Sequence, residues 1–215
     1  MTMETASAFA RSARVAVADL GIGNFAALAK MIARFGADVH RVDTPSGLSG
    51  ATHVVLPGVG AFDYAVQTLD RGGWREPLMQ VLANGDRPVL CVCVGMQLLA
   101  MDSQEGPGAG LGFLRARCVR FPDDADLKVP HMGWNTLDVV RPTGLFPANA
   151  EERFYFVHSY HLQCDDPDDV VATAHYGVDF PAVVAREHVT GVQFHPEKSH
   201  RFGLELIGRF LASRC

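Results

Sequence analysis

The sequence predicts an α/β fold with a mostly parallel central sheet, helices on both of its faces and an antiparallel extension. In the first half of the chain, short apolar runs alternate with segments whose apolar residues recur at helical spacing. This alternation is typical of parallel strands that are buried on both faces by the helices between them. In the second half, strand-like segments follow one another closely, as they do in antiparallel hairpins.

The first half contains the expected parallel strands. "RVAVADL" predicts a strand from Arg14, and the amphipathic "NFAALAKMIARFG" predicts a helix that Gly36 ends. Further strands are expected at residues 38–43, 52–58 and 87–94, with helices around 61–71, 74–84 and 96–104.

The second half contains the expected antiparallel strands. They are predicted at residues 115–121, 134–141, 153–162, 170–177 and 181–188, with one more from 189. Tyr176-Gly177 predicts a hairpin turn, and residues 202–214 predict a closing helix.

Length, charge and cysteine content narrow the classes of function. The 215 residues suit a single domain at 14–215, after a flexible tail at 1–13 that lacks the long apolar segment of a secretory signal. A net charge of -5 argues against a nucleic-acid or anionic-membrane partner, and no apolar stretch approaches the roughly 18 residues of a membrane span. The odd number of cysteines, mostly in apolar segments, favours a reducing, cytoplasmic compartment.

"PVLCVCVGMQLLA" raises the question of which cysteine, if any, is a nucleophile. Cys93 precedes Gly95 by two positions at the expected turn from strand to helix. Such a turn exposes a side chain, its small residues allow close approach, and the helix N-terminus favours a negative charge. Cys91 lies inside the strand, so Cys93 is the better candidate. Two other interpretations stay open: both cysteines are buried and inert, or the pair binds metal or forms a redox couple.

"GVQFHPEKS" offers a partner for such a nucleophile. Pro196 favours an extended conformation for His195, so His195 and Glu197 can present their side chains to the same side. A carboxylate beside a histidine orients its ring, and this predicts a Cys-His-Glu triad.

"LPGVGAF" follows another strand and offers an oxyanion site. Gly58 and Gly60 allow backbone amides to point into a cavity, and the amide of Val94 would be a second donor. An ordinary glycine-rich turn is the alternative. "DLGIGNF" lacks the spacing of a dinucleotide-binding loop.

Together these motifs resemble the class I (triad) glutamine amidotransferases, whose fold is flavodoxin-like. "CVGMQLL" and "GVQFHPEKS" resemble segments of the whole family. "LPGVGAF", "VPHMGWN", "RFYFVHSY" and "HPEKSHRFGLELIGRFL" are similar to the glutaminase subunit of imidazole glycerol phosphate synthase, in histidine biosynthesis. "DLGIGN" is similar to its N-terminal loop, with Leu20 where an aromatic is common, and the resemblance covers residues 14–213.

The resemblance implies hydrolysis of glutamine to glutamate and ammonia, without a cofactor or a metal. It implies that Cys93 forms a glutamyl thioester, that His195 transfers protons and that Glu197 holds the histidine ring. The oxyanion would be stabilised by the amides of Val94, Gly58 and Val59. The substrate would be bound by Gly60, Gln97, His158, Ser159 and Tyr160.

The resemblance also implies a partner, a (β/α)₈ cyclase subunit that forms a heterodimer with this chain. The cyclase would receive the ammonia and make imidazole glycerol phosphate and AICAR. The positions expected at the interface or near the ammonia passage are Asn24, Met132, Trp134, Tyr155 and Lys198. We further hypothesise that the 57–60 loop holds its amides away from the site until the cyclase binds its nucleotide ligand.

The chain departs from the family pattern at Cys91, where glycine is usual. The added side chain could tighten the packing behind Cys93, and it leaves internal oxidation open. Three other functions compete: a triad amidotransferase of the pyridoxal-phosphate or anthranilate synthase type, against which "PHMGWN" argues; a peptidase of the same fold; and an inert binding scaffold.

Overall fold

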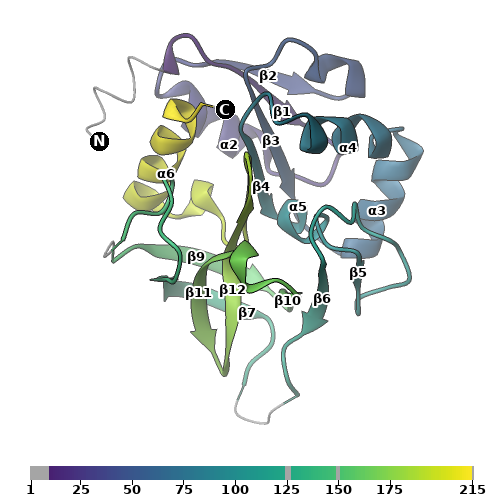
Figure 1. Ribbon diagram of the computed structural model, residues 1–215, viewed down its shortest axis with the longest axis vertical. Helices are drawn as coiled ribbons and strands as arrows, with labels where there is room; N and C mark the ends of the chain where they lie inside the picture. The colour runs from purple at the N-terminus through teal and green to yellow at the C-terminus, as the bar shows by residue number, and fades with distance from the viewer. Residues whose placement is uncertain (1–9, 124–126, 149–150, 215) are drawn as a thin grey trace.

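A computed structural model describes residues 10–123, 127–148 and 151–214 of the chain (Figure 1). Its largest sheet has eight strands in the order β2-β1-β3-β4-β13-β12-β11-β8. The first five of these strands run parallel, and the last three continue the sheet in antiparallel pairs. Their bounds are β2 (Asp38–Val42), β1 (Arg14–Ala18), β3 (His53–Gly58), β4 (Val89–Cys93), β13 (Val189–Val192), β12 (Val178–Arg186), β11 (Val170–Tyr176) and β8 (Asp138–Val139).

Two smaller sheets accompany the large one. Their strands are β10 (Tyr160–Cys164), β6 (Ala116–Arg120) and β5 (Asp102–Ser103) in one sheet, and β7 (His131–Thr136) and β9 (Arg153–His158) in the other. The α-helices are α2 (Phe25–Ala33), α3 (Phe62–Arg71), α4 (Arg75–Asn84), α5 (Val94–Gln97) and α6 (His200–Ala212). Short 3-10 helices cover Pro45–Leu48, Pro167–Asp169 and Pro196–Lys198.

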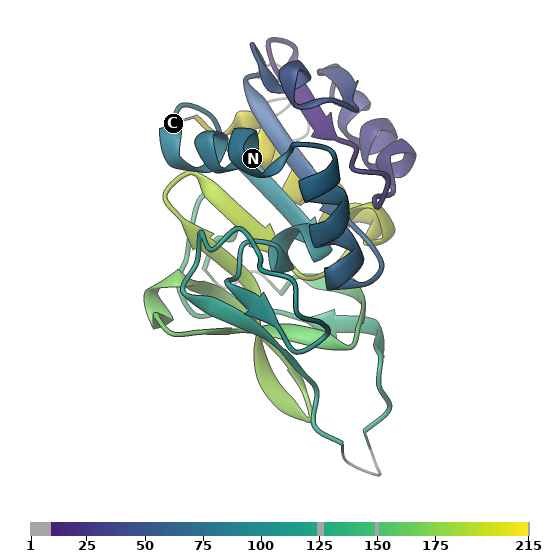
Figure 2. The same cartoon turned by 90° about the vertical axis from the view of Figure 1, so that its right-hand side faces the viewer.

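The helices lie on both sides of the parallel strands. Helices α2 and α6 pack together on one side, and α3 and α4 lie on the other (Figure 1). The small antiparallel strands gather at the far end of the molecule from β2, as Figure 2 also shows. This arrangement confirms the predicted fold: a mostly parallel sheet between helices, with an antiparallel extension.

Strands β3 and β4, which end at the predicted site, are buried along their whole length. Each residue of β3 and β4 is buried, in keeping with their apolar sequences. Strand β4 lies between β3 and β13, and Leu56 and Gly191 both pair with Cys91. The strand order reverses between β1 and β3, and in open α/β sheets a crevice forms at the carboxyl ends of strands beside such a reversal. The loops that follow β1 and β3 are therefore neighbours.

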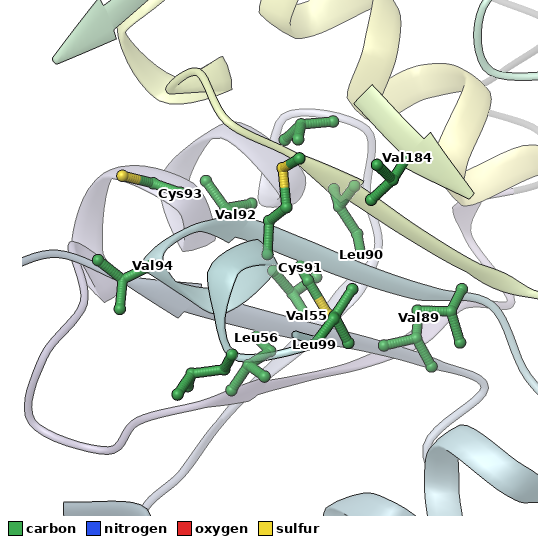
Figure 3. Packing of buried hydrophobic residues seen from close by; sticks show 14 of the residues in the cluster. Val55, Leu56, Val89, Leu90, Cys91, Val92, Cys93, Val94, Leu99 and Val184 are labelled. Atoms are coloured by element: carbon green, nitrogen blue, oxygen red, sulfur yellow. The ribbon is translucent and has the colours of Figure 1, made fainter. Parts of the chain in front are cut away.

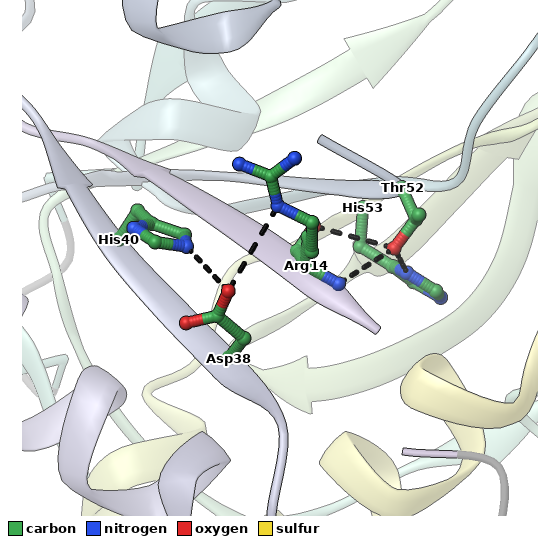
Figure 4. Close-up of polar contacts among 5 residues, drawn as sticks. All are labelled: Arg14, Asp38, His40, Thr52 and His53. Atoms are coloured by element: carbon green, nitrogen blue, oxygen red, sulfur yellow. Dashed lines mark hydrogen bonds and ion pairs between the residues drawn. The ribbon is translucent and has the colours of Figure 1, made fainter. Parts of the chain in front are cut away.

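Polar contacts connect the amino-terminal ends of β1 and β3, at the end of the sheet opposite this crevice (Figure 4). The backbone amide of Arg14 donates to Thr52 Oγ1 over 2.9 Å, and Thr52 Oγ1 lies 2.9 Å from His53 Nδ1. Asp38 on β2 pairs with His40 over 2.7 Å. Ahead of β1, the amide of Ala13 donates to the carbonyl of Ala10 in a turn, and both alanines are buried. Residues 10–13 of the expected tail thus contact the fold, and residues 1–9 lie outside the described residues.

The helix expected at 96–104 is wrong beyond its first turn. Helix α5 ends at Gln97, and β5 begins at Asp102. The carbonyls of Leu98, Leu99 and Ala100 accept hydrogen bonds from the amides of residues 111, 114 and 112. These carbonyls therefore bond a distant segment, whereas a continuing helix would have bonded them to its own next turn.

Candidate active site

Cys93 occupies the sharp turn between β4 and α5. Its backbone lies in the left-handed half of conformational space, at φ 54 and ψ -112, which is uncommon for a residue other than glycine. Figure 3 shows its side chain projecting from the end of β4, away from the core around Cys91. Such strain is typical of a nucleophile held at a strand-to-helix turn.

Glycine is required at both positions where α5 and β3 meet, Gly95 on α5 and Gly58 on β3. A Cβ on Gly95 would stand 2.0 Å from the carbonyl oxygen of Leu56, and one on Gly58 would stand 2.7 Å from the amide nitrogen of Gly95. Helix α5 can therefore approach β3 closely because neither glycine has a side chain.

The two cysteines of the C-x-C pair have different surroundings. Cys91 is fully buried in the core, and burial raises the pKa of its thiol to about 12. Cys93 is also buried, at 4% exposed, but it lines a cavity of about 520 Å³. The strained turn at Cys93 forms with Cys91 in place, and the Cys91 side chain packs in the core. Among the described residues, no group of three or more His, Cys, Asp or Glu side chains could hold a metal ion.

His195 and Glu197 line the same cavity as Cys93. Nδ1 of His195 lies 3.0 Å from Oε1 of Glu197, and both side chains are 2% exposed. Burial alone would lower the pKa of His195, but Cys93 and Glu197 outweigh it and raise the pKa to about 9. Nε2 of His195 is buried and has no hydrogen-bond partner of ordinary geometry among the described residues, which leaves it available for proton transfer in the cavity.

The backbone around His195 is fixed by strand β9 and Ser199. The amide of His195 donates to the carbonyl of Tyr155 over 2.9 Å, and the hydroxyl of Ser199 donates to the carbonyl of His195 over 2.6 Å. Ser199 in turn accepts from the amide of Tyr155 over 3.0 Å. The histidine is thus attached to the antiparallel part of the molecule as well as to β13.

The predicted oxyanion residues lie around the cavity mouth. Gly58 pairs with Cys93 in the β3–β4 ladder, Val94 is the first residue of α5, and Val59 and Gly60 line the cavity. The amide of Val59, however, donates to the carbonyl of Ile22 in the loop after β1. In this conformation the Val59 amide is engaged outside the oxyanion position.

The predicted substrate-binding residues all line the cavity: Gly60, Gln97, His158, Ser159 and Tyr160. Gln97 reaches the cavity from α5, and the other four lie in the loop after β3 or at the β9–β10 corner. The side-chain nitrogen of Gln97 donates to the carbonyl of Tyr160 over 3.0 Å and to Oε1 of Gln193 over 3.1 Å.

Two polar residues at the site were not among those predicted from the sequence. Glu105 lines the cavity, and its carboxylate accepts from the amide of Phe62 over 2.7 Å at the start of α3. Gln193 is fully buried, and its side-chain nitrogen donates to Sγ of Cys93 over 3.7 Å. Nothing in the sequence around Glu105 signals a site, but a lone glutamine in the apolar run before His195 is a usable signal.

Two buried histidines lie next to each other at this end of the cavity, and one of them, His158, lines it. Nδ1 of His131 lies 3.0 Å from Nε2 of His158, and Nδ1 of His158 lies 2.9 Å from the carbonyl oxygen of Tyr160. Burial lowers the pKa of His131 to about 4 and that of His158 to about 3. Both rings are therefore neutral near pH 7.

The residues predicted for a partner interface lie beside the cavity mouth. Met132 and Trp134 on β7 are 61% and 40% exposed, and the Lys198 ammonium lies 5.7 Å from the ring of Tyr155 on β9. We call Met132, Trp134 and Tyr155 the β7–β9 face. Asn24 and Lys198 also line the cavity, so this face and the active site adjoin.

The chain is similar to known proteins over nearly its whole length. Residues 16–212 match the family described as "Glutamine amidotransferase class-I". Subunit HisH 2 of imidazole glycerol phosphate synthase from Pseudomonas aeruginosa is 43% identical over 199 residues, which are 92% of this chain and 98% of that protein. Subunit HisH from Bdellovibrio bacteriovorus is 44% identical over 200 residues, or 91% and 98% of the two chains.

Solved structures share the fold at lower identity. A crystal structure of a glutamine amidotransferase superposes with a TM-score of 0.68 at 22% identity, covering 90% of this chain and 98% of that one. PurLQS from Thermotoga maritima gives a TM-score of 0.68 at 17% identity, with 93% and 97% covered. The chain therefore belongs to the class I glutamine amidotransferase family and, within it, to the group of HisH subunits of imidazole glycerol phosphate synthase.

Proposed function

We propose that this chain hydrolyses glutamine to glutamate and ammonia and delivers the ammonia to a cyclase subunit in histidine biosynthesis. The observation that carries the proposal is the single cavity in which Cys93, His195 and Glu197 meet at the ends of neighbouring strands. The HisH relatives support the choice of synthase. The family match over residues 16–212 supports one catalytic domain at 14–215.

The first half of the reaction forms a thioester. A protonated His195 favours the thiolate of Cys93, which attacks the side-chain amide carbon of glutamine. The C–S bond forms as the carbonyl electrons move to oxygen. The amide of Val94 and an amide of the 58–60 loop stabilise that oxyanion. His195 then protonates the leaving nitrogen, the C–N bond breaks and ammonia departs.

The second half regenerates the enzyme. His195 takes a proton from water, the hydroxide attacks the thioester carbon, and the C–S bond breaks to release glutamate and the thiolate. Glu197 holds the ring of His195 in one orientation through both halves. At the other end of the substrate, the carboxylate of Glu105 offers a partner for the α-ammonium group, and Gln97 with residues 158–160 shapes the wall.

The ammonia needs a protected path, because a protonated molecule is no longer a nucleophile. We propose that a (β/α)₈ cyclase docks on the β7–β9 face with Asn24 and Lys198 at the rim. An exposed tryptophan and methionine next to a reactive cavity support this docking, since aromatic residues and methionine are enriched at the cores of interfaces.

Activity would depend on the cyclase and its ligand. The Val59 amide is bound to the carbonyl of Ile22, and a backbone change that freed this amide would complete the oxyanion site. Asn24, on the same loop as Ile22, lies at the proposed interface, so docking can act on that bond. This would limit wasteful hydrolysis when no acceptor is present.

None of the described helices combines the length and the apolar composition of a membrane-spanning segment. The four cysteines that the structure describes form no disulfide, which supports the proposed cytoplasmic location.

The test is glutamate release by the chain alone, with the cyclase, and with the cyclase plus its nucleotide ligand. We expect strong stimulation by the liganded cyclase, its loss in Cys93→Ala and its retention in Cys164→Ala, a half-buried cysteine outside the cavity. Activity that survives in Cys93→Ala would overturn the mechanism. If the isolated chain already hydrolysed glutamine at the rate of the liganded complex, the proposed dependence on the cyclase would be wrong, and the catalytic mechanism would be unaffected.

A further inference from the structure

We infer that Gln193 is a further catalytic residue, whose side-chain N–H stabilises the thiolate of Cys93, and that Gln97 is the positioning residue that fixes its orientation. This inference rests on the proposed glutamine hydrolysis and adds a role outside the Cys-His-Glu triad. It starts from a feature that the triad does not explain: a fully buried glutamine side chain in contact with the reacting sulfur.

The sheet register places Gln193 beside Cys93. Strands β13 and β4 run parallel, and Val192 pairs with Val92. The next residue on each strand is Gln193 and Cys93, so the two side chains meet at the carboxyl ends of neighbouring strands. A buried amide is costly unless it is hydrogen-bonded. Gln193 meets this requirement with two partners, Gln97 on its oxygen and Cys93 on its nitrogen.

The network allows a single orientation of the two amide groups. The carbonyl of Tyr160 can only accept, so Gln97 must present its NH₂ group there. The same nitrogen reaches Oε1 of Gln193, which turns the NH₂ group of Gln193 toward Sγ of Cys93. A donor rather than an acceptor therefore faces the sulfur, and a donor favours the thiolate, whereas a carbonyl oxygen would oppose it.

The carbonyl that sets this orientation is itself held from behind. Because the carbonyl of Tyr160 accepts, Nδ1 of His158 must carry the hydrogen, and Nε2 of His158 then accepts from Nδ1 of His131. The neutral histidine pair thus fixes the position of the carbonyl. The hydrogen-bonded contacts thus connect the histidine pair, through the carbonyl of Tyr160, to Gln97, Gln193 and finally the sulfur of Cys93.

Other charged or titratable groups also face the cavity of Cys93. They are His195 and Glu197 from the segment after β13, Lys198 beside them, Glu105 from the loop after β5, and His158 and Tyr160 from the β9–β10 corner. His195 alone could stabilise the thiolate, so the contribution of Gln193 must be measured with His195 intact. A neutral donor changes the thiolate population without altering the net charge of the cavity.

The experiment measures the alkylation rate of Cys93 by iodoacetamide as a function of pH, with the labelled peptide identified by mass spectrometry. The full chain is used, as wild type and as Gln193→Met, Gln193→Glu and Gln97→Met. Because hydrogen bonds to charged groups are among the stronger ones, we expect Gln193→Met to slow alkylation about tenfold near neutral pH. The rate should recover at high pH, where the thiolate forms without help.

The variants should differ in how strongly they slow alkylation. Gln193→Glu places a negative charge against the sulfur and should slow the reaction further, whereas Gln97→Met, which only loosens the orientation of Gln193, should slow it less. Gln163→Glu, the same change at an exposed position of β10, should react like wild type. If Gln193→Glu does not fold, Gln193→Met decides the question, because it adds no charge to the core.

Alkylation separates this inference from the proposed function, because it requires no glutamine turnover. An unchanged pH profile in Gln193→Met, with wild-type glutaminase active beside the cyclase, would overturn the role of Gln193 and leave the function intact. A uniform loss of rate at every pH would also overturn it, because that pattern indicates structural damage. A shifted profile in a chain without glutaminase activity would support the thiolate effect and contradict the function.

Discussion

The parallel and antiparallel parts of the molecule contribute to the cavity in different ways. The parallel strands β3, β4 and β13 end in short segments that carry the reacting groups, and their positions follow from register and from glycines that allow close approach. The antiparallel strands β7, β9 and β10 carry the exposed β7–β9 face and the buried histidine pair, and their backbone carbonyls accept hydrogen bonds from His195 and Gln97.

The difference separates two kinds of dependence. At the ends of the parallel strands, a small change in backbone position moves a reacting atom, so substitutions there should reduce turnover, whether or not they also lower the free energy of unfolding. In the antiparallel part, side chains support a carbonyl or contact a partner, so substitutions there should change the free energy of unfolding or the affinity for the partner. Variants in each part, compared with matched controls, test whether this separation holds.

Gly95→Ala should give the largest effect. Its Cβ would stand 2.0 Å from the carbonyl oxygen of Leu56, and backbone cannot give way as a flexible side chain can. We expect a loss of about 3 kcal/mol or more in the free energy of unfolding, with loss of glutaminase activity. Gly144→Ala is the control, because its Cβ would meet nothing within 4 Å. Urea unfolding of both variants measures the difference, and similar stabilities would show that α5 can move away from β3.

Glu197→Gln should come second, as a loss of turnover without a loss of fold. The amide keeps the shape but removes the charge that helps to hold the pKa of His195 at about 9. We expect kcat/KM to fall about a hundredfold or more in the liganded complex. The pKa of His195, followed by NMR, should move down toward its ordinary value. Glu205→Gln, an exposed carboxylate on α6, is the matched control. Unchanged turnover would mean that the ring of His195 is oriented by its backbone contacts alone.

The sequence predicted the parts of the site that depend on local spacing. Cys93 with Gly95 and His195 with Glu197 are each two residues apart, so a turn or an extended segment is enough to orient them. The alternation of strands and helices predicted the sheet in the same way, because each strand was apolar along its length.

What the sequence could not predict depends on residues far apart in the chain. The end of α5 is set by amides at 111–114, and the Val59 amide is bound by the carbonyl of Ile22. Gln97 and Gln193 are 96 positions apart, and their meeting requires the β4–β13 pairing. Glu105 reaches the cavity through a loop that has no periodic pattern. Each of these contacts follows from the assembled sheet, which local patterns do not specify.

The buried histidines should make the fold sensitive to acid. His158 is 6% exposed, and its pKa in the folded chain is about 3, below the ordinary value of 6.5. Below pH 6.5 the unfolded chain therefore binds a proton that the folded chain does not, and stability falls as pH falls. At about pH 5 the loss from His158 is about 2 kcal/mol.

His158→Gln tests this in the antiparallel part. The variant should be less stable than wild type near neutral pH, yet lose less of its free energy of unfolding on acidification. His175→Gln is the control, since this histidine side chain is 72% exposed. Urea unfolding at each pH measures this. Equal acid sensitivity in wild type and His158→Gln would show that another group causes the loss of stability in acid.

Met132→Ala should give the smallest effect, confined to partner binding. Met132 is 61% exposed on the β7–β9 face, so its truncation leaves no cavity in the core and should not change stability. If the cyclase covers this face, the variant loses apolar contact there, and we expect its Kd to rise about fivefold, or about 1 kcal/mol. Met101→Ala makes the same change at a side chain that is 43% exposed and lies outside the face.

Calorimetric titration with the cyclase compares the two methionine variants directly. At saturating cyclase, Met132→Ala should reach the turnover of wild type, because the lost contact affects occupancy and not the reacting groups. A weaker complex for Met101→Ala than for Met132→Ala would place the cyclase on another surface. A lower turnover at saturation would show instead that the β7–β9 face takes part in activation, and the separation between the two parts of the molecule would then fail at this face.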